Sequence, residues 1–208
     1  MKTMPKSKPT AMTTRLNRTF PYLLIVCSAI ALICSFVLSQ DELELAKNPN
    51  FVPSCNLNPV LSCGDVIRTH QAALFNFPNP WIGLVAFAVF MTIGVGLLAG
   101  AQFRRWFWIS MEAGLGMAMI FAYWLLLQSV YVIQALCPFC LIVDVVLTIT
   151  FWYTTLYLIA NGHINLPNRL KAVGAFARQH HAEILVTWFL LLVALILQHF
   201  WYYYGQFL

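Results

Sequence analysis

The stretch CPFCLIVDVVLTITFWYTTLYLI, residues 137–159, decides the fold because it is long and apolar enough to cross a membrane. Its single charged residue is Asp144. A transmembrane helix needs about 20 mostly apolar residues, whereas barrel strands are shorter and alternate apolar with polar residues. In lipid the backbone must satisfy its own hydrogen bonds, which favours a helix. A Cys-x-x-Cys motif, Cys137 to Cys140, opens this predicted helix.

Four further runs have the same character, at residues 20–39, 80–103, 106–129 and 184–204. The whole chain is 61% hydrophobic and 9% charged, whereas soluble domains average about 45–50% apolar and about 25% charged residues. The first run is long enough to span and has no clear small-residue cleavage site, so we expect a retained helix and not a signal peptide. The sequence therefore predicts an all-α, polytopic membrane protein with five spans.

The basic residues predict the orientation of these spans. If the N-terminus is inside, ten of the 12 Lys and Arg residues lie on that side: five in residues 1–19, two at Arg104 and Arg105, and three in residues 160–183. Such a bias is the positive-inside signal, so the net charge of +5 needs no nucleic-acid partner to explain it. The prediction divides the chain into a cytoplasmic basic tail (1–19), a bundle (20–159) with an outside loop (40–79), a cytoplasmic connection (160–183), and a fifth span with an outside C-terminus (184–208).

Four of the six cysteines fall on the predicted outside face, where disulfides persist. Cys55 and Cys63 lie in the outside loop, and Cys137 and Cys140 open the span at 137–159. A redox-active pair is favoured there, because Pro138 suits a first helical turn and a helix start stabilises a thiolate. Two alternatives stay open: a structural disulfide, although so short a ring constrains little chain, and a four-cysteine zinc site, although the Cys55–Cys63 spacing is loose for it.

Three other residues inside the spans are expected to serve packing or internal pairing. Cys27 and Cys34 share one face of the first span, where free cysteine packs as a small hydrophobic residue. Glu112 lies toward the inside end of its span, and an acid there needs an internal partner.

Four motifs then follow one another: SCNLNPVLSC (54–63), GDVIRT (64–69), FPNPWIGL (77–84) and LCPFC (136–140). In this order, over residues 20–157, the chain resembles the vitamin K epoxide reductase family, in particular its bacterial members that oxidise thiols for disulfide formation. The resemblance implies a four-helix bundle around a quinone, menaquinone or ubiquinone, in the bacterial cytoplasmic membrane. Because the chain ends soon after the fifth span, the implied electron donor is a separate, extracytoplasmic DsbA-like thioredoxin-fold protein.

The resemblance also implies a role for each of the four cysteines. Cys140 would meet the quinone, and Cys137 would be its resolving partner. Cys63 would exchange with Cys137, and Cys55 would form the mixed disulfide with the soluble protein. Electrons would then pass from Cys55/Cys63 to Cys137/Cys140 to quinone.

Three more residues carry implied roles. Asn79 matches an asparagine expected to hydrogen-bond a quinone carbonyl, and Thr69 matches a serine or threonine that supports the loop. Asp144 stands where mammalian members have a tyrosine associated with the vitamin K ring. Reduction of vitamin K epoxide or of quinone as the natural role is therefore the alternative to thiol oxidation. A non-enzymatic protein, with a four-cysteine metal site or with structural disulfides, is the alternative of another class.

The residues themselves add three expectations about the pocket. Residues 64–77 predict a short interfacial helix that covers the quinone, with Val66 and Phe77 on its apolar face. Asp144 lies one turn beyond Cys140 on the same helical stripe, so it is a candidate proton donor, or else bonds a polar side chain such as Gln128 or Gln134. Phe77 and Trp81 are candidate aromatic walls of the pocket.

Overall fold

The computed structural model describes residues 11–164 and 167–205, and in this part the regular elements are helices. In chain order they are α1 (Ala11–Lys47), α2 (Cys63–Ile67), the 3-10 helix η1 (His70–Ala73), α3 (Asn79–Leu98), α4 (Arg105–Gln128), the π-helical turn η2 (Ser129–Ile133), α5 (Pro138–Ala160), α6 (Asn168–Gln179), α7 (His181–His199) and α8 (Trp201–Tyr204). Five helices are long and apolar enough to cross a membrane: α1, α3, α4 continued by η2, α5, and α7. The chain is therefore a multi-pass membrane protein, and the predicted fold class is confirmed.

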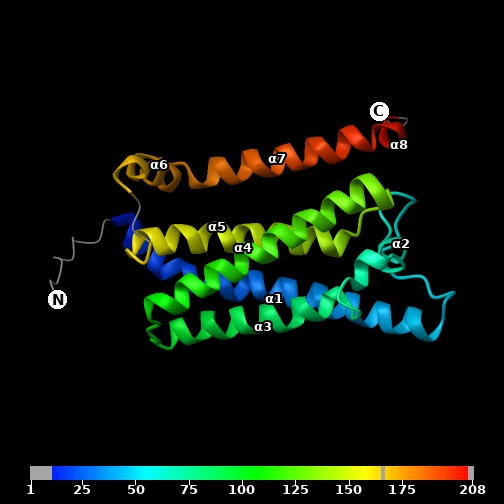
Figure 1. Ribbon diagram of the computed structural model, residues 1–208, viewed down its shortest axis with the longest axis horizontal. Helices are drawn as coiled ribbons and strands as arrows, with labels where there is room; N and C mark the ends of the chain where they lie inside the picture. Colours follow the sequence, from blue (N-terminus) through cyan, green and yellow to red (C-terminus); the bar gives the residue numbers. More distant parts are fainter. Residues whose placement is uncertain (1–10, 165–166, 206–208) are drawn as a thin grey trace.

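Four of these helices form an elongated bundle. α1 packs along α3 and α5, and α4 packs along α5. The N-terminal end of α1, the α3–α4 turn and α6 lie at one end of the bundle, whereas α2 and α8 lie at the other (Figure 1). Both cysteine pairs are at the α2 end, which we call the cysteine end, because α2 begins at Cys63 and α5 begins beside Cys137.

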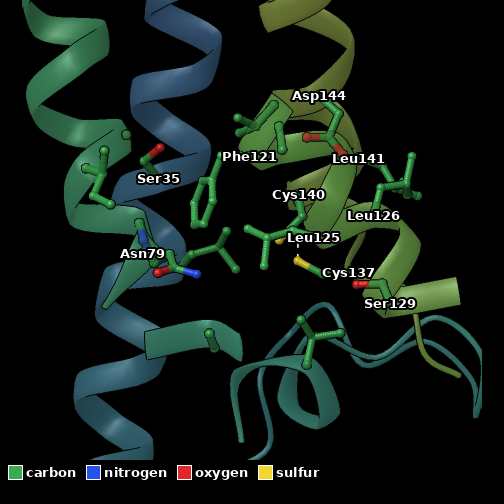
Figure 2. Close-up of a pocket in the computed structure, with 18 of the residues that line it drawn as sticks. Ser35, Asn79, Phe121, Leu125, Leu126, Ser129, Cys137, Cys140, Leu141 and Asp144 are labelled. Atoms are coloured by element: carbon green, nitrogen blue, oxygen red, sulfur yellow. Dashed lines mark hydrogen bonds between the residues drawn. The ribbon is translucent and has the colours of Figure 1, made fainter. Parts of the chain in front are cut away.

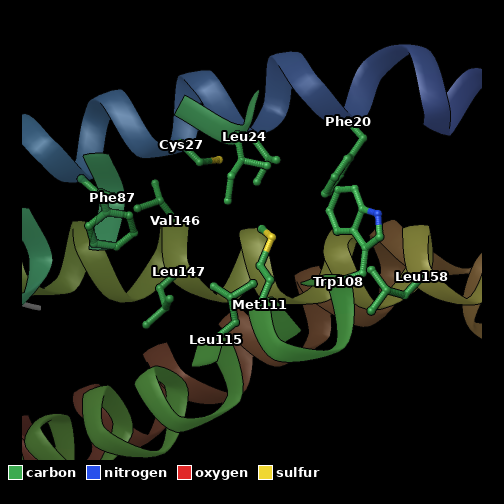
Figure 3. Packing of buried hydrophobic residues seen from close by; sticks show 12 residues of the cluster. Phe20, Leu24, Cys27, Phe87, Trp108, Met111, Leu115, Val146, Leu147 and Leu158 are labelled. Carbon is green, nitrogen blue, oxygen red and sulfur yellow. The ribbon is translucent and has the colours of Figure 1, made fainter. Parts of the chain in front are cut away.

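The bundle core is built from large side chains of α1, α4 and α5. Phe20 stacks on Tyr157 with ring centroids 4.3 Å apart. Trp108, which is 2% exposed, lies beside Phe20 (Figure 3). Within a membrane such contacts stabilise by close packing, since lipid tails are as apolar as the core. Cys27 belongs to this core, and both Cys27 and Cys34 are buried free thiols. The packing role expected for these two cysteines is thus what the structure shows.

Small residues let α3 approach α1 closely, as is usual between membrane helices. A Cβ at Gly94 would lie 3.1 Å from the Pro21 carbonyl oxygen, and one at Gly83 would lie 2.5 Å from Ser35 Oγ. The second contact matters for the site, because it fixes the register of α1 against the start of α3.

Helix α1 continues past the predicted span. The prediction ended the first span at residue 39, but the helix runs to Lys47, so the connection from α1 to α3 is 48–78 and not 40–79. Residues 40–47 stay helical because they carry good helix formers such as Leu, Glu, Ala and Lys. As a result Asp41 and Glu42 belong to a bundle helix. At its other end α1 begins inside the predicted tail; residues 1–10 of that tail, and residues 206–208 of the predicted outside C-terminus, lie outside the described residues.

The continuous helix predicted for residues 64–77 is wrong. The segment forms two short pieces, α2 and η1, because Thr69 between them is extended (φ −86°, ψ 154°). Of the residues expected on its covering face, which include Val66 and Phe77, Val66 lines the cavity described below, whereas Phe77 does not.

Helix α7 lies apart from the bundle, and none of its described residues is buried (Figure 1). It is attached through a few aromatic and polar contacts, such as Trp188 Nε1 donating to Tyr123 OH at 2.7 Å and the Tyr153–His181 hydrogen bond at 3.0 Å. The predicted fifth span, 184–204, is shorter than expected, since α7 ends at His199. The predicted connection 160–183 contains a helix of its own, α6.

Glu112 has the internal partner that its place in a span requires. Thr155 Oγ1 of α5 donates to Glu112 Oε1, and this bond ties α4 to α5.

Candidate redox site

The loop pair, Cys55 and Cys63, forms a disulfide in an ordered loop. Asparagine side chains close the turns: Asn56 Oδ1 accepts from Gly64 N at 2.8 Å, and Asn58 Oδ1 accepts from the next loop amides. Asparagine is suited to such turns because its side chain hydrogen-bonds nearby backbone. Cys55 is 5% exposed and Cys63 is fully buried. The loop disulfide is therefore covered, not displayed to solvent.

A short backbone pairing brings the loop to the start of α5. Leu61 and Leu136 form a parallel bridge, in which Ser62 N donates to Leu136 O at 2.9 Å and Leu136 N donates to Val60 O at 2.7 Å. The residue after each donor is a cysteine, Cys63 on the loop and Cys137 on the helix side. Cys55, Cys63 and Cys137 consequently share one buried cluster, together with Leu38 of α1.

The helix pair, Cys137 and Cys140, occupies the first turn of α5. Cys137 is the N-cap, Pro138 takes the first helical position, and Cys140 N donates to Cys137 Sγ at 3.2 Å (Figure 2). Pro at this position has no N–H to leave unsatisfied and already has helical φ. A backbone N–H aimed at sulfur is also the interaction that favours thiolate chemistry at helix starts. Both are free thiols; Cys137 is buried and Cys140 half-buried.

A cavity of about 220 Å³ lies between α1, α3, α4 and α5 at the cysteine end, beneath α2 and η1 (Figure 2). Most of its wall is apolar, including Phe87, Phe121 and Leu125. Its polar side chains are few: Ser35, Glu42, Thr69, Gln71, Asn79, Ser129 and Asp144, besides the two cysteines Cys137 and Cys140. An apolar pocket with a few convergent polar groups is typical of a small-molecule site, and a flat ring with two carbonyl oxygens fits this character.

Asn79 is held at the cavity wall by η1, which together with α2 covers this end of the cavity and is called the lid below. Its Nδ2 donates to Gln71 O of η1 at 2.7 Å, and its Oδ1 is buried without a partner. A buried amide oxygen left without a donor is unusual in a folded protein. The unpaired Oδ1 can only accept, so it suits the O–H of a hydroquinone, whereas a quinone carbonyl would have to accept from the second N–H of Nδ2.

Asp144 lies deeper in the same wall, one turn beyond Cys140 (Figure 2). Thr148 Oγ1 donates to its backbone oxygen at 2.6 Å. Among the described residues no side chain hydrogen-bonds its carboxylate, so the alternative pairing with Gln128 or Gln134 is not found. The carboxylate is available to the cavity.

The remaining predicted residues separate into two groups. Thr69 lines the cavity, and its Oγ1 donates to Val66 O at 2.7 Å, which supports the turn between α2 and η1. Phe77 and Trp81 do not line the cavity: they are 39% and 43% exposed and stack on each other at 6.5 Å. The aromatic residues predicted there are not part of the described cavity, where Phe121 and Phe87 supply aromatic surface instead.

Sequence reasoning missed the contribution of α1. Ser35 and Glu42 line the cavity, and Asp41 Oδ2 lies 3.9 Å from Cys55 Sγ. The signal that could have indicated this contribution was the pair of acids, Asp41 and Glu42, just after an apolar span. The prediction assigned these two acids to a loop.

The four cysteines do not form a metal site in the described part of the chain. Within residues 11–164 and 167–205 no three His, Cys, Asp or Glu side chains are placed to hold a metal ion. The Cys55–Cys63 disulfide leaves neither of these two sulfur atoms free to serve as a thiolate ligand.

The fold and the site define a multi-pass membrane oxidoreductase in which a disulfide, a thiol pair and an apolar cavity are joined. The family model described as the vitamin K epoxide reductase family matches residues 22–155. The match covers most of α1 and nearly all of α5, with every element of the site between them, and the chain belongs to this family. Its proteins carry out membrane redox reactions on quinones or vitamin K epoxide. A comparison with curated protein sequences gives no match.

Proposed function

We propose that this protein is a thiol:quinone oxidoreductase that reoxidises an extracytoplasmic DsbA-like thioredoxin-fold protein for disulfide formation. The observation that supports it most is the burial of Cys55, Cys63 and Cys137 in one cluster, with Cys140 in the cavity wall. Thiol–disulfide exchange needs sulfur atoms in contact, and the Leu61–Leu136 pairing provides that proximity. Four cysteines are thus ordered from loop to cavity.

The proposed steps balance in electrons and protons. A reduced partner dithiol opens the Cys55–Cys63 disulfide by attack at Cys55, and its second thiol completes the transfer. Cys63 then attacks the Cys137–Cys140 disulfide, and Cys55 closes on Cys63, so that two electrons reach the helix pair. Reduced Cys137/Cys140 finally transfers two electrons to quinone, which takes up two protons. The loop pair is oxidised and the helix pair reduced in the structure, a distribution that belongs between the last two steps.

Asn79 and Asp144 are proposed to position and protonate the quinone. Both line the cavity, and the Oδ1 of Asn79 is buried without a hydrogen-bond partner. Asn79 Nδ2 donates to one carbonyl oxygen of the quinone, its Oδ1 accepts from the O–H of the hydroquinone, and Asp144 supplies a proton at the deep end. Menaquinone and ubiquinone both fit this chemistry.

The charge pattern supports the proposed placement in the membrane. We infer that the cysteine end faces the extracytoplasmic side of a bacterial cytoplasmic membrane, since seven of the nine Lys and Arg residues in the described part of the chain belong to segments at the opposite end. A soluble thioredoxin-fold partner can reach the loop only from that side.

Anaerobic turnover of the purified protein tests the proposal. With reduced DsbA as donor and ubiquinone-1 or menadione as acceptor, absorbance should show quinone reduction that requires both protein and donor. Reduction of vitamin K epoxide at a higher rate than either quinone, or no use of the protein donor, would contradict the proposal. The matched control is the Cys27→Ser variant, whose thiol lies in the bundle core away from the site.

A further inference from the structure

Two consecutive acids near the end of α1 face different parts of the redox site. Asp41 is 8% exposed, and its Oδ2 lies 3.9 Å from Cys55 Sγ. Glu42 lines the cavity, and its Oε2 is buried without a hydrogen-bond partner. Neighbouring residues point about 100° apart around a helix with 3.6 residues per turn, so one segment can serve both places.

We propose that Asp41 takes and returns the proton of Cys55, and that Glu42 supplies a proton to the quinone at the lid side of the cavity. The inference rests on the thiol:quinone activity proposed above and assigns protons that this activity must move. Each dithiol oxidised releases two protons with its two electrons, and each quinone reduced consumes two.

Asp41 is placed to act when the loop disulfide closes. After Cys63 has attacked Cys137, the mixed disulfide Cys63–Cys137 must be resolved by Cys55. The Asp41 carboxylate accepts the Cys55 proton, and the Cys55 thiolate forms a bond to Cys63 as the Cys63–Cys137 bond breaks. Cys137 leaves as a thiolate, so charge and electrons balance, and the proton stays on Asp41. Cys55 becomes a leaving group in another step, when the second thiol of the partner releases it from the mixed disulfide. In that step protonated Asp41 returns the proton to the Cys55 sulfur.

Glu42 and Asp144 lie at opposite ends of the cavity. Ser35 of α1 meets Gly83 of α3, and Glu42 is seven residues further along α1, about 10 Å toward the lid. Asp144 lies on the other side of Cys140, away from the lid (Figure 2). The two carbonyl oxygens of a quinone are also on opposite sides of its ring. One acid therefore serves each oxygen.

Within the described part of the chain, neither Asp41 nor Glu42 forms the ion pair by which a surface carboxylate often stabilises a helix. Among the described residues, neither Asp41 nor Glu42 makes an ion pair, whereas Glu44 on the same turn pairs with exposed Lys47 at 2.7 Å. A largely buried acid without a cationic partner costs free energy, and in a membrane helix it marks a functional position.

The Asp41→Asn variant tests the first assignment, because the amide keeps the side-chain shape but cannot accept the proton. During turnover with reduced DsbA and ubiquinone-1, samples are quenched in acid, alkylated and analysed by non-reducing mass spectrometry. We expect turnover to fall on the order of 10²-fold, a usual contribution of proton transfer, while the Cys63–Cys137 mixed disulfide accumulates. A merely structural defect in the loop would lower the mixed disulfide instead, and that result would overturn the assignment. Glu44→Gln is the matched control and should leave both quantities unchanged.

The Glu42→Gln variant tests the second assignment in a separate half-reaction. Protein with reduced Cys137/Cys140 is mixed with ubiquinone-1, and quinone reduction is followed in a single turnover. We expect this step to slow at least about tenfold, while reduction of the loop disulfide by DsbA stays at the wild-type rate. Equal slowing of both half-reactions, or of neither, would overturn the role of Glu42.

The outcomes also distinguish this inference from the function on which it rests. Wild-type protein that reduces no quinone with DsbA refutes the proposed function, and the roles of both acids with it. Normal wild-type turnover together with normal Asp41→Asn and Glu42→Gln variants overturns the acid assignments alone.

Discussion

The two cysteine pairs are held in place by different means. The helix pair is positioned by the helix itself, with Cys137 as N-cap and Cys140 one turn in. The loop pair depends on asparagine side chains that satisfy loop amides and on the Leu61–Leu136 bridge. One pair is thus fixed to the quinone cavity by rigid structure. The other is held by a few hydrogen bonds, whose opening would expose the buried disulfide to the soluble partner proposed above.

This difference predicts the largest effect for the helix pair. Cys140→Ser should reduce quinone reduction to background with every donor, protein or small dithiol, because no other thiol pair reaches the cavity among the described residues. The measurement is quinone absorbance under anaerobic conditions. Turnover above background with dithiothreitol would show that Cys140 is not the thiol that meets the quinone.

The loop pair should be needed only for large donors. Cys55→Ser should abolish turnover with reduced DsbA but keep a substantial rate with dithiothreitol, which is small enough to reach the helix pair through the cavity. The ratio of the two rates measures the effect. Loss of both activities to the same extent in a protein that still binds quinone would refute the separation of tasks.

Weakening the hydrogen bonds of the loop should have a smaller effect. Asn58→Ala leaves the amides of Val60 and Leu61 without their acceptor, at a cost of about 1–3 kcal/mol for each buried group left unpaired. We expect faster hydrogen exchange at these amides and a slower transfer from loop to helix pair. Asn48→Ala, which removes an exposed side-chain acceptor in the same connection, is the control. Exchange rates equal to those of the control would show that Asn58 does not order the loop.

The smallest effect on quinone turnover is expected for substitutions of the two exposed aromatic residues, Phe77 and Trp81. Phe77→Leu and Trp81→Leu should leave quinone turnover within about twofold of wild type, the usual range for surface positions. Phe121→Leu should raise the KM for quinone, because Phe121 lines the cavity. A larger rise for Phe77→Leu than for Phe121→Leu would place the quinone ring outside the described cavity.

The predictable features of this chain are those with a local cause. Apolar length gives the five spans, and the Cys-x-x-Cys with Pro138 gives the start of α5. Asn79, to which the family resemblance assigned a quinone contact, and Asp144, which its place one turn beyond Cys140 made a candidate proton donor, both line the cavity.

What could not be predicted depends on contacts between distant segments or on small backbone changes. The Leu61–Leu136 bridge joins two segments with no common signal in the sequence. The extended conformation of Thr69 breaks a helix that residues 64–77 otherwise favour, and Phe77 is not among the residues that line the cavity. The acids after residue 39 show where the apolar run ends, but they do not show where the helix ends. For this reason the sequence did not predict that the end of α1 contributes Asp41 and Glu42 to the site.

The most direct test of the account is the pairing of Cys63 with Cys137. A protein carrying Cys55→Ser and Cys140→Ser retains one thiol of each pair, at positions that belong to one buried cluster. After mild oxidation and tryptic digestion under non-reducing conditions, mass spectrometry should find a Cys63–Cys137 disulfide in most of the protein. Free thiols at both positions, or disulfides formed between separate molecules, would contradict electron transfer from the loop pair to the helix pair.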